Sequence, residues 1–322
     1  MTRARVARAS RPCRQGQARS AAARRGWPCD TSARCPCYGK IDFSNTLPEK
    51  GHHRIVQGSV AVSVRQLTDK AEIEAFLRKN AELHVYSLGD LDDFFWPRTT
   101  WYGWRKDSEL QDIVLVYSGT GVPTVVGITE QPEVMSQRMR EIVPLLPPRF
   151  YAHLSPGVED AFKKTHRLDP HGPHYKMALR NASRLASVDG AGVVRLEQHD
   201  QDELLRLYEE SYPGNWFDPR MLKTGQYFGL RVKRRLISAA GVHVYSEQYR
   251  VAAVGNVVTH PAHRNRGHGT RVTARLCQSL LERVRQVGLN VQADNHAAMA
   301  CYQNLGFEVV APYGEFTVDR RL

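Results

Sequence analysis

A basic turn that contains two glycines is the part of this chain best suited to chemistry. It reads Arg264-Asn265-Arg266-Gly267-His268-Gly269. The apolar run 251–259 before it predicts a buried strand, and apolar residues recur at helical spacing in the run 270–287 after it. A strand that leads through such a turn into a helix aims free N–H groups and the positive helix end at one point. This arrangement favours an anion site, most naturally for a pyrophosphate.

The helix after the turn is expected to continue as far as Val287. Its apolar positions are Val272, Leu276, Leu280, Val284 and Val287. Gly288 follows where a helix should stop.

A second motif follows at a short distance. Residues 289–293 predict another buried strand, and residues 295–307 predict a short helix. Asp294 or Asn295 can cap the start of this helix, and Gly306 can end it.

The two segments together resemble the GCN5-related N-acetyltransferase (GNAT) superfamily over roughly residues 190–318. In that family an R-x-x-G-x-G turn binds the pyrophosphate of acetyl-CoA. An N-x-x-A-x-x-x-Y-x-x-L-G-F segment holds the pantetheine arm and supplies a tyrosine acid. The matching residues here are Arg264, Gly267 and Gly269, then Asn295, Ala298, Tyr302, Leu305, Gly306 and Phe307.

The resemblance implies acetyl-CoA as the acyl donor and Tyr302 as the acid that protonates the departing thiolate. It also implies that the strand ending at Thr259 splays from the strand at 289–293, so that the pantetheine lies between them. The residues expected at the donor are Val257, Val258, Thr259, Arg264, Asn265, Arg266, Gly267, His268, Gly269, Thr270 and Asn295.

The general base is not fixed by the sequence. Many relatives carry a glutamate on the strand before the turn, but residues 250–259 contain no carboxylate. Glu247 and His243 are candidates, and a water chain held by Asn256 is an equal alternative.

The acceptor is expected to approach over the loop that carries Glu210, Tyr212 and Trp216. Acids beside aromatic rings suit a cationic amine, although they equally suit a solvated helix end beside a buried tryptophan. The cluster of Asp90, Asp92 and Asp93 before residues 94–96 either closes the acceptor site or ends a strand. No metal site is expected.

The excess positive charge belongs to the N-terminus. The net charge is +12, and residues 1–55 hold twelve Lys or Arg against three acids. Residues 1–58 are therefore expected to be a disordered basic tail, a targeting extension, or a stretch upstream of a start near Val60. The almost balanced remainder argues against nucleic-acid binding. The cysteine spacing in the tail is not that of a zinc site. With no apolar run of about 20 residues, we expect a cytoplasmic protein that does not enter membranes.

The strand and helix patterns predict a mixed α/β chain of two domains, residues 59–182 and 183–322. The second is expected to be a GNAT fold, a mostly antiparallel sheet flanked by helices. The first is expected to be a smaller α/β domain. The layout resembles the glycine N-acyltransferase and FR47-like group, in which the first half is a degenerate copy of the catalytic fold. Helices are expected at 68–80, 132–145, 200–211 and 218–222. Strands are expected at 113–117, 124–128, 151–154, 174–179, 193–196, 227–232 and 236–245, with a linker at 181–192.

The expected function is the transfer of acetyl from acetyl-CoA to a primary amine by direct attack in a ternary complex. The acceptor is expected to be a small molecule or a peptide. The alternative is a non-catalytic module that senses acyl-CoA.

Overall fold

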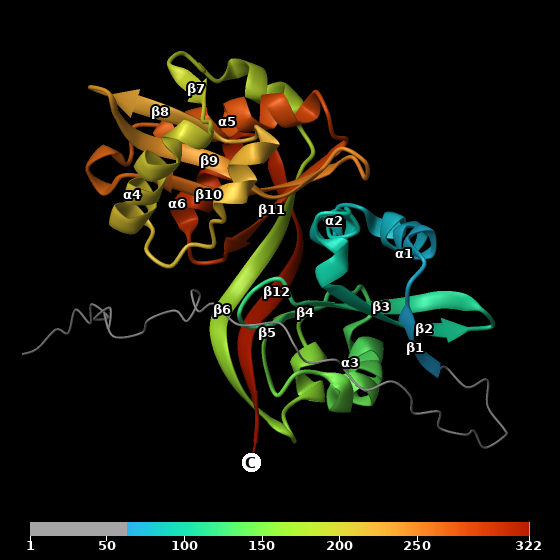
Figure 1. Cartoon of the computed structure of the whole chain (residues 1–322). Coiled ribbons are helices and arrows are strands. Elements are labelled where there is room, and N and C mark those ends of the chain that lie inside the picture. The colour runs from blue at the N-terminus through green and yellow to red at the C-terminus, as the bar shows by residue number, and fades with distance from the viewer. Residues whose placement is uncertain (1–62, 322) are drawn as a thin grey trace, which may run out of the picture. The chain divides into compact units, whose positions relative to one another are not determined.

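A twelve-stranded sheet runs through residues 63–321, the part of the chain that the computed structural model describes (Figure 1). The basic tail predicted for residues 1–58 lies outside these residues. The strand order is β1-β2-β3-β4-β5-β12-β6-β11-β10-β9-β8-β7. Two neighbouring pairs are parallel, β4 with β5 and β10 with β11, and the other pairs are antiparallel.

Among the described residues, the first half contributes six strands and three α-helices. Its strands are β1 (Ser63–Leu67), β2 (Thr99–Lys106), β3 (Glu109–Tyr117), β4 (Thr124–Gly127), β5 (Arg149–Leu154) and β6 (His166–Leu179). Its α-helices are α1 (Lys70–Leu77), α2 (Val85–Gly89) and α3 (Pro132–Ile142).

The second half begins at β7. Its strands are β7 (Val193–Arg195), β8 (Phe228–Val232), β9 (Arg235–Ser246), β10 (Val251–Thr259), β11 (Gln286–Gln292) and β12 (Phe307–Arg320). Its α-helices are α4 (Gln201–Ser211), α5 (His268–Leu281) and α6 (His296–Asn304). Short 3₁₀ segments include η5 (Ala182–Ser187), η7 (Pro219–Thr224) and η8 (Pro261–His263).

The strand order of the sheet repeats itself about its centre. From one edge, β1 to β5 lie in chain order, and the last two of them, β4 and β5, are parallel. From the other edge, β7 to β11 lie in chain order, and the last two of them, β10 and β11, are parallel. The last strand of each half then pairs with the other half. β6 lies beside β11, and β12 lies beside β5. This repeat is the arrangement expected of a chain whose first half copies the fold of its second half. The boundary between domains at residues 182 and 183 stays a prediction, because the sheet continues across the two halves.

Most of the predicted elements are present, and the mixed sheet flanked by helices is confirmed. The predicted strand before the glycine turn is β10, with the same bounds. The predicted helices at 68–80 and 132–145 are α1 and α3, each extended by a 3₁₀ turn. Asp69 caps α1 by accepting hydrogen bonds from the N–H groups of Ala71 and Glu72.

The expected end of the helix after the glycine turn is wrong. α5 ends at Leu281, and Val287 and Gly288 lie in β11. The chain turns back here because the N–H groups of Arg285 and Gln286 both bond to the carbonyl of Arg250. Gly288 is therefore a strand residue. A β-carbon there would lie 3.2 Å from both the Met177 carbonyl and the Val85 side chain, so the glycine allows α2 to pack closely on the sheet.

The predicted linker 181–192 is mostly exposed, and it contains η5, whose Leu185 is 2% exposed and accepts a hydrogen bond from Gln278 at its carbonyl. Its role as a linker stays a prediction. The sequence analysis also missed β2 and α2. The five residues of α2 are too few to show helical periodicity.

Among residues 63–321, none of the helices combines the length and the apolar character that a membrane span requires.

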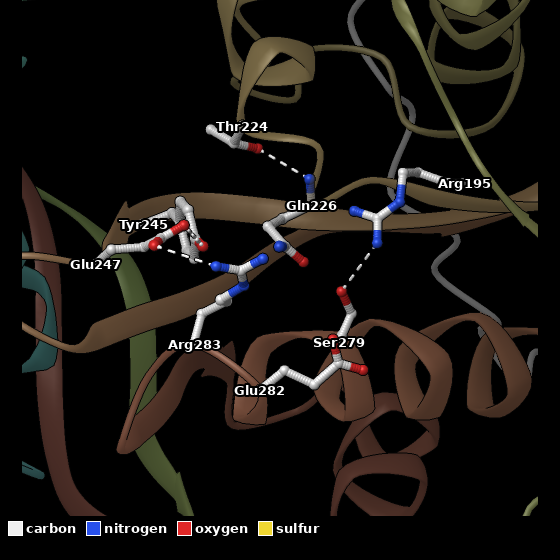
Figure 2. Close-up of a pocket in the computed structure, with 8 residues that line it drawn as sticks. All are labelled: Arg195, Thr224, Gln226, Tyr245, Glu247, Ser279, Glu282 and Arg283. Carbon is white, nitrogen blue, oxygen red and sulfur yellow. Dashed lines mark hydrogen bonds and ion pairs between the residues drawn. The ribbon is translucent and has the colours of Figure 1, made fainter.

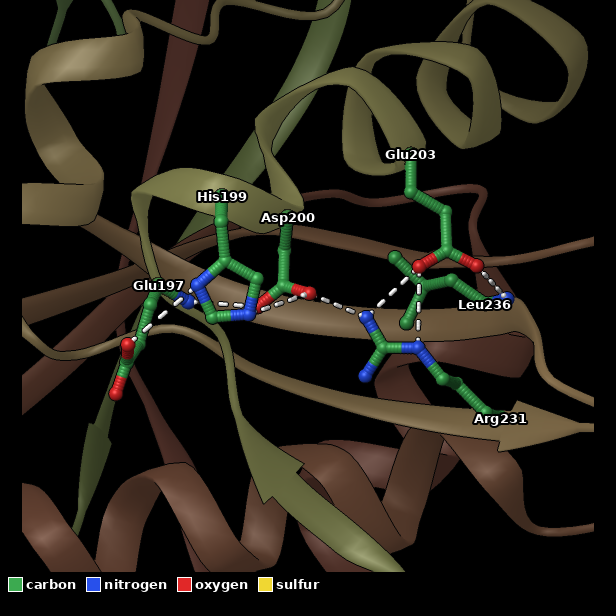
Figure 3. Close-up of polar contacts among 6 residues, drawn as sticks. All are labelled: Glu197, His199, Asp200, Glu203, Arg231 and Leu236. Atoms are coloured by element: carbon green, nitrogen blue, oxygen red, sulfur yellow. Dashed lines mark hydrogen bonds and ion pairs between the residues drawn. The ribbon is translucent and has the colours of Figure 1, made fainter.

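A network of charged side chains fastens α4 to the β8–β9 hairpin (Figure 3). The carboxylate of Glu203 accepts hydrogen bonds from Arg231 Nε at 3.0 Å and from the Leu236 N–H at 2.6 Å. Arg231 also donates to Asp200 at 2.6 Å, and the second oxygen of Asp200 caps the N–H of Glu197. These contacts fix the helix that leads into the loop carrying Tyr212 and Trp216.

We predict that Glu203→Ala lowers the free energy of unfolding by about 1–3 kcal/mol, because it leaves the Leu236 N–H and one edge of Arg231 without partners. Urea denaturation measures the change. Glu209→Ala, on the exposed face of the same helix, is the matched control and should stay within about 0.5 kcal/mol of the parent. An equal loss in both variants would show that the network does not anchor α4.

Candidate active site

The glycine turn presents the uncapped start of a long helix. Gly267 has a φ of +74° and is the N-cap of α5, with no side chain capping the helix. The first helical N–H to find a carbonyl is that of Arg271, which bonds to Gly267 at 3.0 Å. The N–H groups of His268, Gly269 and Thr270 are therefore free to bind an anion.

Space around the turn is set by its glycines. No atom lies within 4 Å of the position that a β-carbon would take on Gly267, so the turn is open on that side. At Gly269 the same position is 3.4 Å from the Thr259 hydroxyl, which is a tight contact. Thr270 contacts the Cys301 thiol at 3.3 Å and so joins the turn to α6. Small residues therefore keep the backbone accessible at this point.

The histidine and arginines of the turn have different roles. The guanidinium of Arg264 donates to the carbonyls of Thr259 at 3.1 Å and Ser211 at 3.2 Å, and so holds the turn against β10 and the end of α4. Arg266 and Asn265 are exposed. His268 Nδ1 is sealed from solvent and has no hydrogen-bond partner among the described residues. Burial, followed by the charge of Arg271, lowers the pKa of His268.

The strands β10 and β11 part next to this turn. They pair in parallel only from Val251 opposite Gln286 to Val254 opposite Leu289. Beyond that point β10 stays paired with β9, and β11 stays paired with β6. The splay implied by the family resemblance is therefore present.

The free edge of β10 carries backbone groups that no strand satisfies. The Val258 carbonyl accepts a hydrogen bond from Ser238, and the His260 N–H bonds to Ile237, so both point toward β9. Because alternate residues of a strand point to opposite neighbours, the amides of Val257 and Thr259 face the parted side. An extended ligand can pair with them there.

Helix α6 lies beyond β11. Asn295 caps it by accepting a hydrogen bond from the Ala298 N–H at 3.1 Å. Gly306 ends it with a φ of +95°, and a β-carbon there would lie 2.1 Å from the Asn181 carbonyl. Both ends follow the sequence prediction.

Tyr302 of α6 is buried, at 8% exposure, and its ring packs edge-on against Phe307. In the described part of the chain its hydroxyl forms no hydrogen bond. Burial raises the pKa of Tyr302 above its ordinary value. The side chain therefore stays protonated and holds a proton that it can donate.

A bulge in β10 places Asn256 at the centre of a polar network. Its φ is +53°, and the pairing with β9 shifts register between Gly255 and Val258. The Asn256 amide donates to the Tyr227 hydroxyl at 2.9 Å, and its oxygen lies 3.2 Å from His243 Nε2. With its amide thus bonded, Asn256 orients His243.

His243 is largely buried and is part of this network. Burial lowers its pKa, while the hydrogen bond with Asn256 and the charge of Glu315 act in the opposite direction. Its ring meets that of Trp216 edge-on, with centroids 5.6 Å apart. A neutral imidazole at this position can accept a proton.

One of the predicted catalytic residues, Glu247, lies apart from this group. Glu247 follows β9 at the end opposite the glycine turn, about nine strand residues or roughly 30 Å away along β10. There it accepts a hydrogen bond from Tyr245 and lies 3.8 Å from Arg283. The structure therefore does not bring Glu247 to the other candidates.

Figure 2 shows Glu247 at the rim of a polar pocket of about 320 Å³. The pocket is lined by Arg195, Thr224, Gln226, Tyr245, Glu247, Ser279, Glu282 and Arg283. None of these residues belongs to the glycine turn, to the parted strands or to α6.

The predicted acceptor residues also differ in whether they lie near the catalytic candidates. Glu210 is occupied by Arg235 at 2.5 Å and by His260 at 3.5 Å. Tyr212 and Trp216 are 48% and 40% exposed. The contact of Trp216 with His243 makes it the acceptor candidate that the structure joins to the catalytic candidates.

A cluster of polar side chains that the sequence analysis missed lies on β5, β6 and β12. The carboxylate of Glu315 accepts hydrogen bonds from Tyr151 and, at 2.7 Å, from Tyr313. Its oxygens also lie 3.6 Å from His153 Nε2 and from His174 Nε2. We call these five residues the Glu315 cluster.

The residues of the Glu315 cluster shift one another's pKa values. Against the effect of burial, His153 and the hydrogen bond from Tyr151 lower the pKa of Glu315. Burial lowers the pKa of His153 to about 4. Glu315 also acts electrostatically on His243 and Tyr212, which puts the cluster within reach of the candidate acceptor loop.

Two of the three aspartates near residue 90 form contacts that hold the fold. Asp92 accepts a hydrogen bond from Ser246 at 2.6 Å, and Asp93 pairs with Lys70 at 2.5 Å. Asp90 differs from both, because burial raises its pKa to about 7 against the opposing charge of Lys176. Asp90 directly follows α2, so the interpretation of this segment as a strand end is wrong, and a role at the acceptor site stays a prediction.

Comparisons with known proteins bear on the second half of the chain. Residues 193–307 match the model of the acetyltransferase (GNAT) family. A comparison with curated proteins finds no match.

Solved structures resemble a larger part of the chain. A Drosophila protein is similar at 14% identity and a TM-score of 0.60, over 80% of this chain and 99% of that chain. A GCN5-related N-acetyltransferase from Sphaerobacter thermophilus is similar at 14% identity and a TM-score of 0.52, over 80% and 96%. A tandem GNAT protein from the clavulanic acid biosynthesis pathway is similar at 16% identity and a TM-score of 0.50, over 81% and 98%.

At these identities the structural likeness concerns the fold alone, and it extends through both halves of the chain. The family match covers the glycine turn, the parted strands and Tyr302. The match to the family model is thus confined to residues 193–307, and the likeness to the solved structures concerns the fold of the chain.

Proposed function

We propose that this protein is an acyl-CoA-dependent N-acetyltransferase, in which the second half transfers acetyl from acetyl-CoA to a primary amine of a small molecule or peptide. The observation that carries the proposal is the parting of β10 and β11 directly beside the uncapped start of α5. An open strand edge and a set of free N–H groups together suit a donor with an extended amide-bearing arm and a pyrophosphate.

The first half lacks the parted strands, which supports a single donor site among the described residues. Its helix α3 also begins without a side-chain cap, but Pro132 at the start of α3 has no N–H to offer an anion. Its equivalent strands β4 and β5 pair over the whole of β4. Past the end of β4, the hydroxyl of Ser155 accepts from the Thr129 N–H at 3.0 Å and donates to the Thr129 carbonyl at 3.1 Å. The chain between β4 and α3 contains no glycine after Gly127. The structural copy has therefore closed its slot.

Acetyl-CoA supplies an activated acyl group as a thioester, and the protein has to orient it and move protons. In our proposal the N–H groups of residues 268–270 bind the pyrophosphate, and the amides of Val257 and Thr259 hold the extended arm. Tyr302 gives its proton to the departing sulfur. His243, oriented by Asn256, takes the proton that the amine loses, directly or through water, because neutral imidazole is the strongest base placed there.

The test of the proposed reaction is release of free CoA from acetyl-CoA in the presence of a panel of primary amines, detected with a thiol reagent. Release that depends on both the amine and the protein supports transfer. Tight binding of acetyl-CoA without release would mean that the chain only senses the donor.

We predict that Gly267→Val weakens acetyl-CoA binding at least tenfold, because a side chain at this open turn excludes the pyrophosphate from N–H groups worth about 1.5–3 kcal/mol each. Calorimetry measures the affinity. Gly157→Val is the matched control, since Gly157 also has a positive φ, of 97°, and also has no atom within 4 Å of its β-carbon position. Equal loss of affinity in both variants would point to strain and against an anion site.

We predict that Tyr302→Phe lowers kcat by about 10²–10⁴-fold, the usual contribution of a positioned proton donor. Donor affinity should hardly change, because the ring still packs on Phe307. Single-turnover kinetics separates the chemical step from product release. A Phe variant that keeps the parent single-turnover rate would leave Tyr302 with a structural role only.

We predict that kcat/KM falls as the pH drops through the pKa of His243, because only the neutral ring accepts a proton. The midpoint should lie below pH 6.5, since burial lowers this pKa. His243→Gln should keep the hydrogen bond to Asn256 and remove this limb of the pH profile. A profile in which the same limb persists in the Gln variant would assign it to another group.

A further inference from the structure

The polar pocket of about 320 Å³ lies beside the last turn of α5, at the end of this helix opposite the glycine turn (Figure 2). Its walls come from β7, from the connection between η7 and β8, from the end of β9 and from the end of α5. Ser279, which lines the pocket, follows Gly267 by twelve residues. About 18 Å of helix therefore separate the pocket from the proposed donor site.

The pocket has a buried floor and a charged rim. The floor consists of Gln226 and Ser279, which are 5% and 2% exposed. The rim consists of four exposed side chains, those of Arg195, Glu247, Glu282 and Arg283. A ligand in the pocket would thus meet neutral polar groups at the bottom and charged groups at the mouth.

The amide oxygen of Gln226 is buried and accepts no hydrogen bond from the residues that the structure describes. The amide bonds to Tyr245 through its nitrogen, which leaves the oxygen as its open end. Thr224 fixes the backbone, because its hydroxyl accepts from the Gln226 N–H at 3.1 Å and donates to the Met221 carbonyl at 2.7 Å. Figure 2 shows the Gln226 side chain pointing from the sheet toward α5.

A buried acceptor without a partner is costly for folding and calls for an explanation. The last torsion of a glutamine side chain is broad, so a small rotation brings the Gln226 oxygen to a ligand in the pocket. A ligand that donates a hydrogen bond to this oxygen would recover the cost.

Other groups of the lining are already bonded to one another. Arg195 donates to the Gly225 carbonyl and, at 3.3 Å, to the Ser279 hydroxyl. The Tyr245 hydroxyl donates to Glu247 at 2.6 Å. The contact between Arg195 and Ser279 ties β7 to α5 and so holds two walls of the pocket in place.

Two side chains at the rim keep most of their hydrogen-bonding capacity. Within residues 63–321, the carboxylate of Glu282 forms neither a hydrogen bond nor an ion pair. Arg283 lies 3.8 Å from Glu247, and its side chain is 61% exposed. Together with the Gln226 oxygen, the pocket offers two open acceptor groups and one open donor group.

The charges of the lining disfavour most kinds of ligand. Its two arginines and two glutamates cancel, so the pocket as a whole attracts neither an anion nor a cation. An anion is a poor occupant of the floor, because the open group there is itself an acceptor. A cation is a poor occupant as well, because the guanidinium of Arg195 lies 3.3 Å from Ser279. The lining residues are all polar or charged, so an apolar group would gain little.

We propose that this pocket is a second binding site, which takes a neutral small molecule with several hydroxyl groups, of about the size of a monosaccharide. A hydroxyl group both donates and accepts, so neighbouring hydroxyls can meet Gln226, Glu282 and Arg283 at the same time. The pocket has the volume of roughly ten water molecules, which suits a ligand of about ten to twelve non-hydrogen atoms. The inference does not depend on the proposed acetyl transfer.

The test is calorimetry of the full chain with D-glucose, D-galactose, D-mannose and myo-inositol. For each hexose, the 2-amino sugar and the uronic acid are the cationic and anionic counterparts. At least one neutral member should bind with a Kd of about 1 mM or below, and its charged counterparts should bind at least about tenfold more weakly. Equal or tighter binding of the counterparts, or no binding by any neutral member, would overturn the inference.

Substitutions place the bound sugar in the pocket. Gln226→Met should weaken binding at least about tenfold, because it removes the open acceptor, and it should melt near the parent temperature, since the unpaired oxygen is removed as well. Arg283→Ala, at the exposed rim, should weaken binding by about tenfold and decides the matter if Gln226→Met does not fold.

The matched control is Gln278→Met. Gln278 lies on α5 outside the pocket, and its amide donates to the Leu185 carbonyl at 3.0 Å. This variant should keep the parent affinity for the sugar. Parent affinity in a folded Gln226→Met, or an equal loss in Gln278→Met, would show that the sugar does not bind at the pocket.

Acetyl-CoA separates this site from the proposed donor site. Saturating acetyl-CoA should leave the affinity for the sugar within about twofold, because the two sites lie far apart on α5. Gly267→Val should likewise leave sugar binding unchanged. Competition between the sugar and acetyl-CoA would place the sugar at the donor site and contradict the inference, whereas a failure of acetyl transfer alone would leave it standing.

Discussion

The separation of β10 from β11 after Val254 and Leu289 is the constraint on which the rest of this site depends. Inside a sheet, each strand edge that loses its neighbour exposes N–H and C=O groups that are costly to leave unpaired. Here the bulge at Asn256 turns β10 toward β9, and β6 keeps the far edge of β11 paired. The unpaired edge is thus confined to one short segment beside the start of α5. A ligand that brings its own amides can complete it.

The last strand of each half pairs with a strand of the other half, and this exchange is a second constraint on the site. Because β6 enters the sheet beside β11, and β12 beside β5, side chains from both ends of the sequence come together. Lys176 and Glu315 belong to the predicted first and second domains, yet the pairing of β6 with β12 brings them close enough for the charge of Glu315 to act on Lys176. The first half therefore contributes to the site with side chains, although its own equivalent of the donor slot is closed by Ser155.

The polar interior is organised around groups that keep one another in a defined protonation state. Asn256 holds His243 on one side and Tyr227 on the other. Glu315 is held by two tyrosines and two histidines. Lys176 is buried and forms no hydrogen bond or ion pair in the part of the chain that the structure describes. Asp90 is a second buried ionisable group in this region, and burial shifts the pKa of both groups toward the neutral form.

The sequence by itself determined the elements of the proposed donor site. The glycine turn and the segment around Tyr302 are local patterns, in which a strand, a turn and a helix follow one another within about 20 residues, so periodicity and capping rules identify them. The same rules placed Asn295 at the start of α6 and Gly306 at its end. They failed at Val287, where the reversal of the chain depends on the Arg250 carbonyl, a group some 35 positions earlier in the sequence. The tertiary structure alone decided the polar interior beside it. His153 and Lys176 come from the consecutive strands β5 and β6, whereas Glu315 comes from β12, near the other end of the chain. Each reads as an ordinary polar residue on an alternating strand. Only the register of β5, β12 and β6 brings them to one face, and only the packing of the folded chain buries Lys176.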